Sequence, residues 1–308
     1  MDPSTRPVLL AGATASGKSA VAIELAGHIG GEIVGVDSMQ VYRGMDVGTA
    51  KPGPVELRRV PHHLVDVADV TESFDAARFV SLATEAVAGI RTRGRVPILC
   101  GGTGLYFNAW LNGLGTAPAP DPALRAELEA LSMEALLDEL ARKDWETFDE
   151  IDVANRRRVV RAVEVIRLTG QPFSRQRARW PDRAQAMAGR SFGLARARED
   201  QWRRIEQRVD RMFEAGLVEE VRALMSRGLQ GNRTAMQAIG YRQVVEHLEG
   251  LRGRLQTIEE VKVRTRQYAR RQGMWFRGQM DLEWLEVAAD EAPAQTAERI
   301  ASRLATSC

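Results

Sequence analysis

The sequence predicts an α/β protein in which a parallel sheet carries helices on both faces and a small all-helical domain is inserted. Two observations predict the sheet: short apolar runs alternate with segments of helical periodicity, and the runs end at glycines or at an aspartate. A third observation predicts the insertion, because the periodicity becomes purely helical from residue 122 to about residue 180.

The expected elements of the first part follow in chain order. They are a strand at 8–11 that stops at Gly12, a helix at 19–29, a strand at 32–37, a helix at 74–93 and a strand at 96–100. This order of strand, glycine turn, helix and strand is typical of a parallel sheet.

The inserted segment is marked by composition and by charge. Residues 112–122 (NGLGTAPAPDP) are rich in glycine and proline and indicate a boundary. Residues 121–152 then hold eleven acids and three bases, and residues 155–179 hold eight arginines and one glutamate. We place the first part of the core at 1–118, the helical insertion at 119–190 and the rest of the core at 191–308.

The last segment begins with an expected strand at 191–195 and continues as helices. These span 201–225, 237–248 and 257–277, and the last begins with a capping box formed by Thr257 and Glu260. We expect this region to contain the helices that contact a polyanion.

Composition narrows the class of protein. The chain has 308 residues, 44% hydrophobic and 27% charged, with a net charge of +2. These values exclude a disordered or disulfide-stapled chain, and no apolar stretch approaches the roughly 20 residues of a membrane span. The two cysteines are Cys100 and Cys308. Because neither suggests a disulfide, we expect a cytoplasmic protein with no membrane association.

The segment GATASGKS fits the P-loop pattern G-x-x-x-x-G-K-[ST], follows an apolar strand and precedes a helix. Such a loop turns its backbone N–H groups around a polyphosphate, its lysine adds a mobile cation, and its serine can bind Mg²⁺. The expected sheet core is therefore P-loop NTPase-like. The residues predicted to hold phosphate are Gly12, Ala13, Thr14, Ala15, Ser16, Gly17, Lys18 and Ser19, with Ser19 as the Mg²⁺ ligand.

Two further polar residues follow strand ends. Asp37 ends the second strand, and it could organise Mg²⁺, act as a general base or serve as a turn residue. Thr103 lies in the Gly101–Gly104 turn after the strand at 96–100. Because the carboxyl ends of parallel strands line the ligand crevice, we expect both residues beside the P-loop.

Arginines outnumber lysines by 39 to four and gather in two regions, 156–179 and 262–277. At 100° per residue, Lys262, Arg266, Arg270 and Arg277 fall on one helical face, with Tyr268, Trp275 and Phe276 interleaved. Solvated charged faces are one interpretation of these clusters. A binding surface for single-stranded or loop RNA is the other, and we favour it.

With these motifs in view, the chain resembles bacterial tRNA dimethylallyltransferases, also called tRNA isopentenyltransferases. The resemblance spans about residues 6–285. Its motifs are GATASGKS, VDSMQVYRGMDVGTAKP, PHHLVD, GGTGLY, RRVVRAVEV, RIEQRVDRM, AIGYRQ and RRQGMWFR.

The resemblance implies that a dimethylallyl group moves from dimethylallyl diphosphate to the exocyclic amine of the tRNA adenosine 3′-adjacent to the anticodon, with Mg²⁺ as cofactor. The P-loop then holds the donor's diphosphate. Asp37 matches the general base, Thr103 matches a residue that contacts the acceptor, and Lys18 belongs to the stretch that matches donor binding; we expect all three to be catalytic. Arg208 is our candidate for a second diphosphate contact, and a surface ion pair is its alternative. We expect a monomer.

The same resemblance implies which residues contact tRNA. They are Asp37, Ser38, Met39, Gln40, Thr103, Arg125, Arg157, Arg158, Val159, Val160, Arg161, Gln237, Ala238, Ile239, Gly240, Tyr241, Arg242, Arg270, Arg271, Gln272, Gly273, Met274, Trp275, Phe276 and Arg277.

The chain departs from the family pattern at two places. Ala13 stands where proline is usual, and Gly273-Met274 replaces a bulkier residue and threonine. Three other functions stay open at this point: prenylation of a free adenine nucleotide, a small-molecule kinase, and RNA binding without chemistry. The arginine-rich C-terminal helices argue against a small acceptor, and the order of the motifs argues against the last.

Overall fold

The computed structural model describes residues 5–178 and 189–306, and its centre is a parallel sheet with the strand order β3-β2-β4-β1-β5-β6. The strands are β1 (Val8–Gly12), β2 (Gly31–Val36), β3 (His62–His63), β4 (Val96–Gly101), β5 (Ser191–Ala195) and β6 (Glu283–Glu286). The expected strands in β1, β2, β4 and β5 are confirmed. The short edge strands β3 and β6 have no clear signal in the sequence.

The chain forms two compact units, which we call the core unit (1–111 and 182–308) and the helical unit (112–181). The predicted insertion at 119–190 overlaps this unit, and its exact bounds stay a prediction. Its helices are α5 (Pro122–Ala130), α6 (Met133–Lys143), α7 (Trp145–Glu150) and α8 (Arg156–Thr169), followed by the 3₁₀ turn Phe173–Arg175. They enclose their own apolar core around Leu128, Leu136 and Val163.

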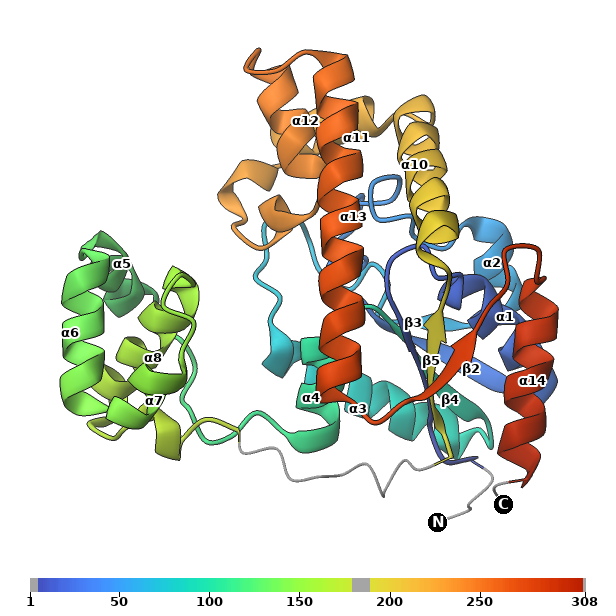
Figure 1. Cartoon of the computed structure of the whole chain (residues 1–308), viewed down its shortest axis with the longest axis horizontal. Helices are drawn as coiled ribbons and strands as arrows, with labels where there is room; N and C mark the ends of the chain where they lie inside the picture. Colours follow the sequence, from blue (N-terminus) through green and yellow to red (C-terminus); the bar gives the residue numbers. More distant parts are fainter. Residues whose placement is uncertain (1–4, 179–188, 307–308) are drawn as a thin grey trace. The chain divides into compact units, whose positions relative to one another are not determined.

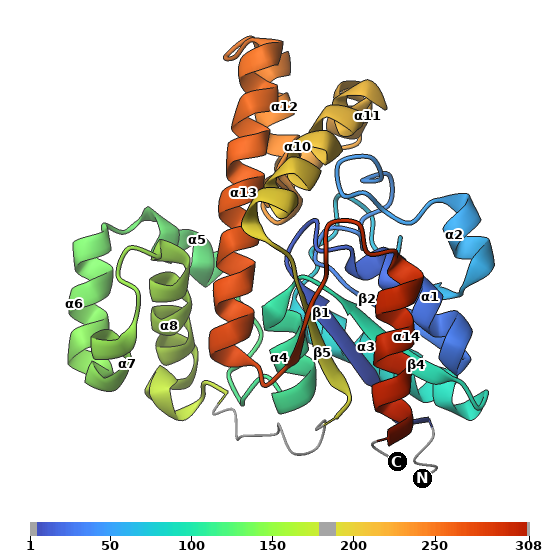
Figure 2. The same ribbon diagram turned by 45° about the vertical axis from the view of Figure 1, so that its right-hand side comes forward.

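Helices cover both faces of the sheet in the core unit, as predicted. The helices are α1 (Lys18–Ile29), α2 (Pro54–Arg59), α3 (Ala76–Thr92), α4 (Gly104–Asn112), α10 (Arg198–Glu214), α11 (Leu217–Ser226), α12 (Tyr241–Leu248), α13 (Arg254–Gln279) and α14 (Pro293–Thr306). Helices α1 and α14 pack on one face, and α3 and α4 on the other (Figures 1 and 2).

Side chains of successive strand residues enter different cores. Leu9 joins the cluster that includes α3, α4 and α10–α13, whereas Leu10 joins the cluster with α1 and α14. Both leucines are fully buried. The sheet is therefore enclosed on both faces, and its ligand-binding surface must lie at the ends of the strands.

Three predicted helix boundaries are wrong, the first being the start at 237, because α12 begins only at Tyr241. The segment 201–225 is two helices, and they separate at Gly216, whose φ of 94° lies outside the helical range. The predicted start at Thr257 is also wrong, because α13 begins at Arg254. There Gly253 donates its N–H to the Gln256 side chain at 3.2 Å, and the Thr257 hydroxyl donates to the Gly253 carbonyl. Thr257 therefore lies inside the helix and caps nothing.

Among residues 5–178 and 189–306, no helix combines the length and the apolar character that crossing a membrane requires.

Candidate functional site

The ends of three neighbouring strands lie in register at one edge of the sheet. Gly101 of β4 pairs with Val36 of β2 on one side and with Ala11 of β1 on the other. The P-loop follows β1, Asp37 follows β2 and the Gly101–Gly104 turn follows β4. The structure thus brings Asp37 and Thr103 to the P-loop, as the strand pattern predicts.

The P-loop wraps tightly between β1 and α1. The Ser16 amide donates to the Ala13 carbonyl at 3.1 Å, and Lys18 Nζ lies 3.5 Å from the same carbonyl oxygen. Ser16 Oγ is buried and has no hydrogen-bond partner within the described part of the chain. A buried hydroxyl without a partner is costly unless a ligand satisfies it. The loop therefore offers an unsatisfied donor, a cation and a helix N-terminus to an anion.

Two cations and one carboxylate share this site. Burial lowers the pKa of Lys18 below its ordinary value, and the neighbouring Asp37 carboxylate partly opposes that effect. Burial also lowers the pKa of Arg208, again with Asp37 in opposition. The guanidinium remains charged under all physiological conditions. An excess of positive charge in a partly dehydrated site attracts an anion such as a diphosphate.

Arg208 reaches the site from α10. Its Nη2 donates to the carbonyl of Thr49 at 3.1 Å, and no ion pair holds it among the described residues. The alternative interpretation of Arg208 as a surface ion pair is thus wrong. Its role as a diphosphate contact stays a prediction, which its closeness to Lys18 and Asp37 supports.

Asp37 combines a turn role with an available oxygen. Its Oδ1 accepts hydrogen bonds from the amides of Met39 at 2.8 Å and Gln40 at 3.2 Å. In the described residues Oδ2 carries no hydrogen bond. The turn interpretation is therefore correct for one carboxylate oxygen, while the other is free to accept a proton from a ligand.

Thr103 is held by the residue after Asp37. Its Oγ1 accepts the Ser38 amide at 3.1 Å, and its own amide donates to the Val36 carbonyl at 3.2 Å. The hydroxyl proton of Thr103 is then available to a ligand beside Asp37.

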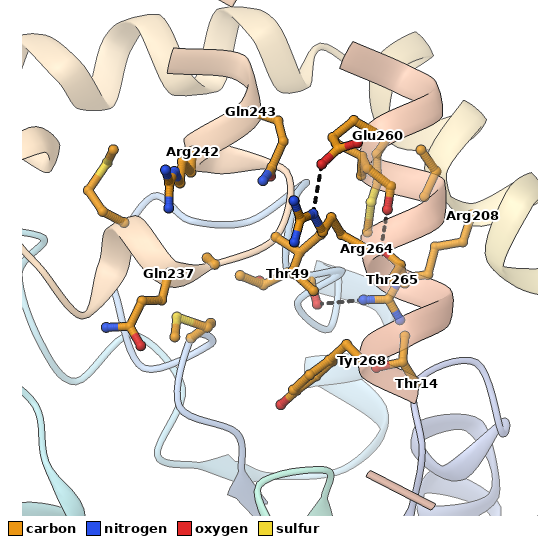
Figure 3. A pocket seen from close by; sticks show the side chains of 18 of the residues that line it. Thr14, Thr49, Arg208, Gln237, Arg242, Gln243, Glu260, Arg264, Thr265 and Tyr268 are labelled. Atoms are coloured by element: carbon orange, nitrogen blue, oxygen red, sulfur yellow. Dashed lines mark hydrogen bonds and ion pairs between the residues drawn. The ribbon is translucent and has the colours of Figure 1, made fainter. Parts of the chain in front are cut away.

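A cavity of about 640 Å³ opens from this edge of the sheet, a volume within the range of small-molecule sites. Thr14 and Asp37 line it at the sheet, Arg208 from α10, and Tyr268 and Arg271 from α13. Figure 3 shows Tyr268 near Thr14 at the lower end and Arg242 and Gln243 of α12 higher up. The cavity therefore connects the P-loop with the C-terminal helices.

Tyr268 is a cavity residue that the sequence indicates only as an aromatic among arginines. Burial raises its pKa to about 12, and the Asp37 charge adds to this effect. The phenol is therefore neutral, and its half-buried ring presents a flat surface in the same cavity as Asp37.

The loop 45–50 forms one wall and is held by a residue that sequence reasoning missed. The Glu220 carboxylate accepts from the amides of Asp46, Val47 and Gly48 at 3.0, 2.7 and 3.3 Å. It also accepts from the Tyr241 hydroxyl at 2.6 Å. Nothing in the sequence around Glu220 distinguishes it from other helical acids.

The predicted tRNA-contacting stretches contain buried side chains as well as exposed ones. Those that are part of a core are Val159, Val160, Ala238, Tyr241, Gln272 and Phe276. Their side chains are buried, although Ala238 also lines the cavity, and the contact of these residues with tRNA stays a prediction. In the core unit, those that line the cavity or are exposed are Asp37, Ser38, Met39, Gln237, Ile239, Arg242, Arg270, Arg271, Met274 and Arg277, and their contact with tRNA stays a prediction.

The predicted basic face of α13 is partly neutralised. Lys262 Nζ lies 2.8 Å from Asp210, and Arg266 Nη1 lies 2.6 Å from Glu206, both on α10. Half of that face therefore packs α13 against α10, and the interpretation of the remaining bases as an RNA-binding surface stays a prediction. Arg270 is exposed, and Arg277 lies over the Trp284 ring at 4.7 Å.

Within the helical unit, the predicted arginines divide into two groups. Arg125 and Arg161 both pair with the fully buried Glu164, at 2.5 and 2.7 Å. Arg157 and Arg158 are exposed at the start of α8. Arg125 and Arg161 thus stabilise the buried carboxylate, Arg157 and Arg158 are the exposed members of this group, and the contact of all four with tRNA stays a prediction.

Comparison with known proteins agrees with this arrangement. The model of the family described as IPP transferase matches residues 40–279. The chain is similar to tRNA dimethylallyltransferase 1 of Trichlorobacter lovleyi, with 42% identity over 296 residues that cover 95% of this chain and 97% of the relative. It is 46% identical over 291 residues to tRNA dimethylallyltransferase of Geobacter metallireducens, covering 92% and 94% of the two chains.

Solved structures give the same result. The crystal structure of the full-length tRNA isopentenylpyrophosphate transferase of Bacillus halodurans aligns with a TM-score of 0.71 and 37% identity, covering 98% of this chain and 97% of that one. A eukaryotic dimethylallyltransferase acting on tRNA aligns with a TM-score of 0.76 and 25% identity, covering 98% and 80%.

Proposed function

The chain belongs to the IPP transferase family, and from this premise we propose the reaction that its cavity performs. The protein is a transferase that modifies tRNA. It moves a dimethylallyl group from dimethylallyl diphosphate to the exocyclic amine of the adenosine 3′-adjacent to the anticodon, and it releases diphosphate. The observation that carries the proposal is the position of Asp37 in one cavity with Arg208 and beside Lys18.

The leaving group presents the main electrostatic task. As the bond between the allylic carbon and the diphosphate oxygen breaks, negative charge grows on the diphosphate. Lys18, Arg208 and the P-loop N–H groups are placed before the reaction begins, so they stabilise that charge without reorganisation. The amides of Thr14 and Ser16 are exceptions, because they donate to Gln272 at 2.8 Å and to the Ala13 carbonyl at 3.1 Å.

The acceptor amine loses a proton as it forms its bond to the allylic carbon. Asp37 Oδ2 is the base that takes this proton, since Oδ1 is engaged by the turn. General-base assistance of this kind is worth about 10²–10⁴-fold in rate. The Thr103 hydroxyl can donate a hydrogen bond to the adenine ring of the acceptor and hold that ring beside Asp37.

The residues at the P-loop fit Mg²⁺ held mainly by the substrate. In residues 5–178 and 189–306, no group of three or more His, Cys, Asp or Glu side chains could hold a metal ion. The exposed Ser19 hydroxyl lies at the first turn of α1 and would supply one ligand, with diphosphate oxygens supplying others. When bound there, Mg²⁺ would neutralise part of the leaving group's charge.

The adenosine must leave the stack of the anticodon loop to enter the cavity, which costs a few kcal/mol. Exposed cavity-lining arginines such as Arg242 and Arg271 are placed to contact backbone phosphates on its approach. We propose that the enzyme works as a monomer, in the cytoplasm where tRNA is used.

The proposal is tested with labelled dimethylallyl diphosphate, Mg²⁺ and bulk tRNA, followed by nuclease digestion. We expect the label on adenosine in the tRNA. Label on free adenosine monophosphate in place of tRNA would indicate the nucleotide prenyltransferase. Transfer of phosphate from γ-labelled ATP to a metabolite would indicate a kinase.

A further inference from the structure

Gln272 connects the P-loop to the turn that carries Thr103. Its Oε1 accepts hydrogen bonds from the Thr14 amide at 2.8 Å and from the Thr14 hydroxyl at 3.0 Å. Its Nε2 donates to the Gly102 carbonyl at 2.8 Å. The side chain is buried, and the same amide interacts with the Tyr268 hydroxyl. One buried side chain on α13 thus spans both loops of the site.

We propose that Gln272 is a positioning residue that fixes the P-loop against the Thr103 turn, and so sets the distance between the prenyl donor and the acceptor amine. This inference rests on the proposed function, because it assigns the donor to the P-loop and the acceptor to Asp37 and Thr103. Gln272 itself touches neither reacting group; it acts through Thr14 and Gly102.

The hydrogen bonds of Gln272 to Thr14 and Gly102 require a carboxamide side chain. The P-loop end presents two donors and therefore needs an acceptor, whereas the Gly102 end presents a carbonyl and needs a donor. A carboxamide supplies both at the two ends of one group. A carboxylate would accept from Thr14 as well, but it would face the Gly102 carbonyl with a second acceptor.

The turn is shaped to receive α13. A Cβ atom added at Gly102 would lie 2.4 Å from Gln272 Nε2, and one added at Gly104 would lie 2.1 Å from ring carbons of Trp275. Both contacts are shorter than packed atoms allow, so a side chain at either position would displace Gln272 or Trp275. The motif RRQGMWFR therefore contributes two residues that hold the Thr103 turn.

Position matters because a misplacement of about 1 Å between reacting groups can cost about 100-fold in rate. Loosening the link should lower kcat and leave the affinity for tRNA nearly unchanged, since the exposed arginines are untouched. A merely structural role would lower the amount of folded protein and leave the kcat of the folded fraction unchanged.

The test compares the parent protein, Gln272→Glu and the control Gln279→Glu across pH 6 to 8.5. Gln279 is exposed on the same helix and forms no hydrogen bond through its side chain in the described part of the chain. We expect Gln272→Glu to lower kcat about 10- to 100-fold at pH 8 with the KM for tRNA within about twofold. Gln279→Glu should match the parent.

The pH profile has a definite sign. A protonated glutamic acid can donate to the Gly102 carbonyl as glutamine does, and burial favours the protonated form. The ratio of the kcat of Gln272→Glu to that of the parent should therefore rise as the pH falls. A kcat within twofold of the parent at all pH values, or a loss that does not change with pH, would overturn the proposal.

Two further measurements separate the possible failures. If Gln272→Glu does not fold, Thr14→Val removes only the hydroxyl donor, and an unchanged kcat would then refute the positioning role. Hydrogen exchange of the amides of residues 101–106 reports whether Gln272 holds the Thr103 turn, and it does not depend on prenyl transfer. A parent protein that transfers no prenyl group defeats the proposed function, whereas exchange that Gln272→Glu leaves unchanged defeats the role of Gln272.

Discussion

The backbone amide of Ser38 donates a hydrogen bond to the Thr103 hydroxyl oxygen, and the two atoms lie 3.1 Å apart. This bond joins the end of β2 to the turn after β4. Because Oγ1 already accepts from the amide, the hydroxyl proton points to another acceptor. The Thr103 side chain is thus prepared to donate to a ligand at the side of Asp37.

Replacing Thr103 with valine tests whether its hydroxyl donates a hydrogen bond to the acceptor. Valine keeps the shape of the side chain but removes the donor to the ligand and the acceptor for Ser38. We expect kcat/KM for tRNA to fall about tenfold or more, the effect of losing one hydrogen bond of about 1.4 kcal/mol. Thr103→Ser keeps the hydroxyl and should stay within a few-fold of the parent. Equal activity of the valine variant would remove Thr103 from acceptor binding.

The two roles of Asp37 can be separated by Asp37→Asn. Asparagine can still accept the amides of Met39 and Gln40 through its carbonyl oxygen, so the turn should persist. It cannot take a proton, so turnover should fall about 10²- to 10⁴-fold while tRNA binding stays nearly intact. Single-turnover kinetics with saturating donor measure the first quantity and filter binding the second. Turnover within a few-fold of the parent would show that another group is the base.

Because of Lys18, the affinity for inorganic diphosphate should decrease at alkaline pH. Burial lowers the pKa of Lys18, so its ammonium loses its proton at a lower pH than an ordinary lysine does. Affinity therefore decreases as the pH rises through that lowered value. Calorimetric titration between pH 7 and 10 measures the decrease.

Lys18→Arg is the matched control, because a guanidinium keeps its charge over this range. Dividing the two affinities at each pH also cancels the ionisation of diphosphate itself. A ratio that does not change with pH would exclude titration of Lys18 as the cause. Lys18→Ala should weaken donor binding or slow diphosphate departure at every pH.

The positions of the phosphate loop, Asp37 and Thr103 could be predicted from the sequence because they depend on strand order alone. Each follows an apolar run, and parallel strands end at the same edge of a sheet. Lys262 and Arg266 show the opposite case. Periodicity places them on one face of α13, but it cannot reveal that Asp210 and Glu206 of α10 meet that face. Such partners are set by helix packing, which local patterns do not encode.

Gln272 illustrates a second limit. Its motif predicts contact with tRNA, and the neighbouring arginines are indeed exposed, but Gln272 points inward to Thr14 and Gly102. A helical face can be assigned from sequence only when its polar residues differ in kind from its buried ones. A buried glutamine among arginines breaks that assumption, because its burial depends on loops from more than 150 residues earlier.

Glu220 should prove essential to the loop at one wall of the cavity. Glu220→Ala removes the acceptor of three backbone amides and of the Tyr241 hydroxyl. We expect the free energy of unfolding to fall by about 2–3 kcal/mol, the cost of losing hydrogen bonds to a charged group and leaving their partners unsatisfied. Urea denaturation measures it.

The neighbouring Glu219 is an exposed acid on the same helix and provides the control. Glu219→Ala should change the free energy of unfolding by no more than about 0.5 kcal/mol. Tyr241→Phe removes one of the four hydrogen bonds and should cost about 1 kcal/mol. Equal effects of the two glutamate variants would show that the loop does not depend on Glu220.

The arginines of α8 should divide by function according to their contacts. Arg161 pairs with the buried Glu164 at 2.7 Å and also donates to the Pro118 carbonyl. Arg161→Ala should therefore destabilise the helical unit by about 1.5–3 kcal/mol, because it leaves a buried carboxylate with fewer partners. Faster hydrogen exchange of the α8 amides would report the loss.

Arg158 lies one turn earlier, is exposed and forms no ion pair in the described part of the chain. If it contacts a tRNA phosphate, Arg158→Ala should weaken tRNA binding and reduce the salt dependence of the affinity by about one counterion, with unchanged exchange in α8. The two variants should therefore give opposite results in the salt dependence of tRNA binding and in the hydrogen exchange of the α8 amides. If Arg161→Ala instead reduced the salt dependence of tRNA binding and left the hydrogen exchange of the α8 amides unchanged, the ion pair with Glu164 would not be the main role of Arg161.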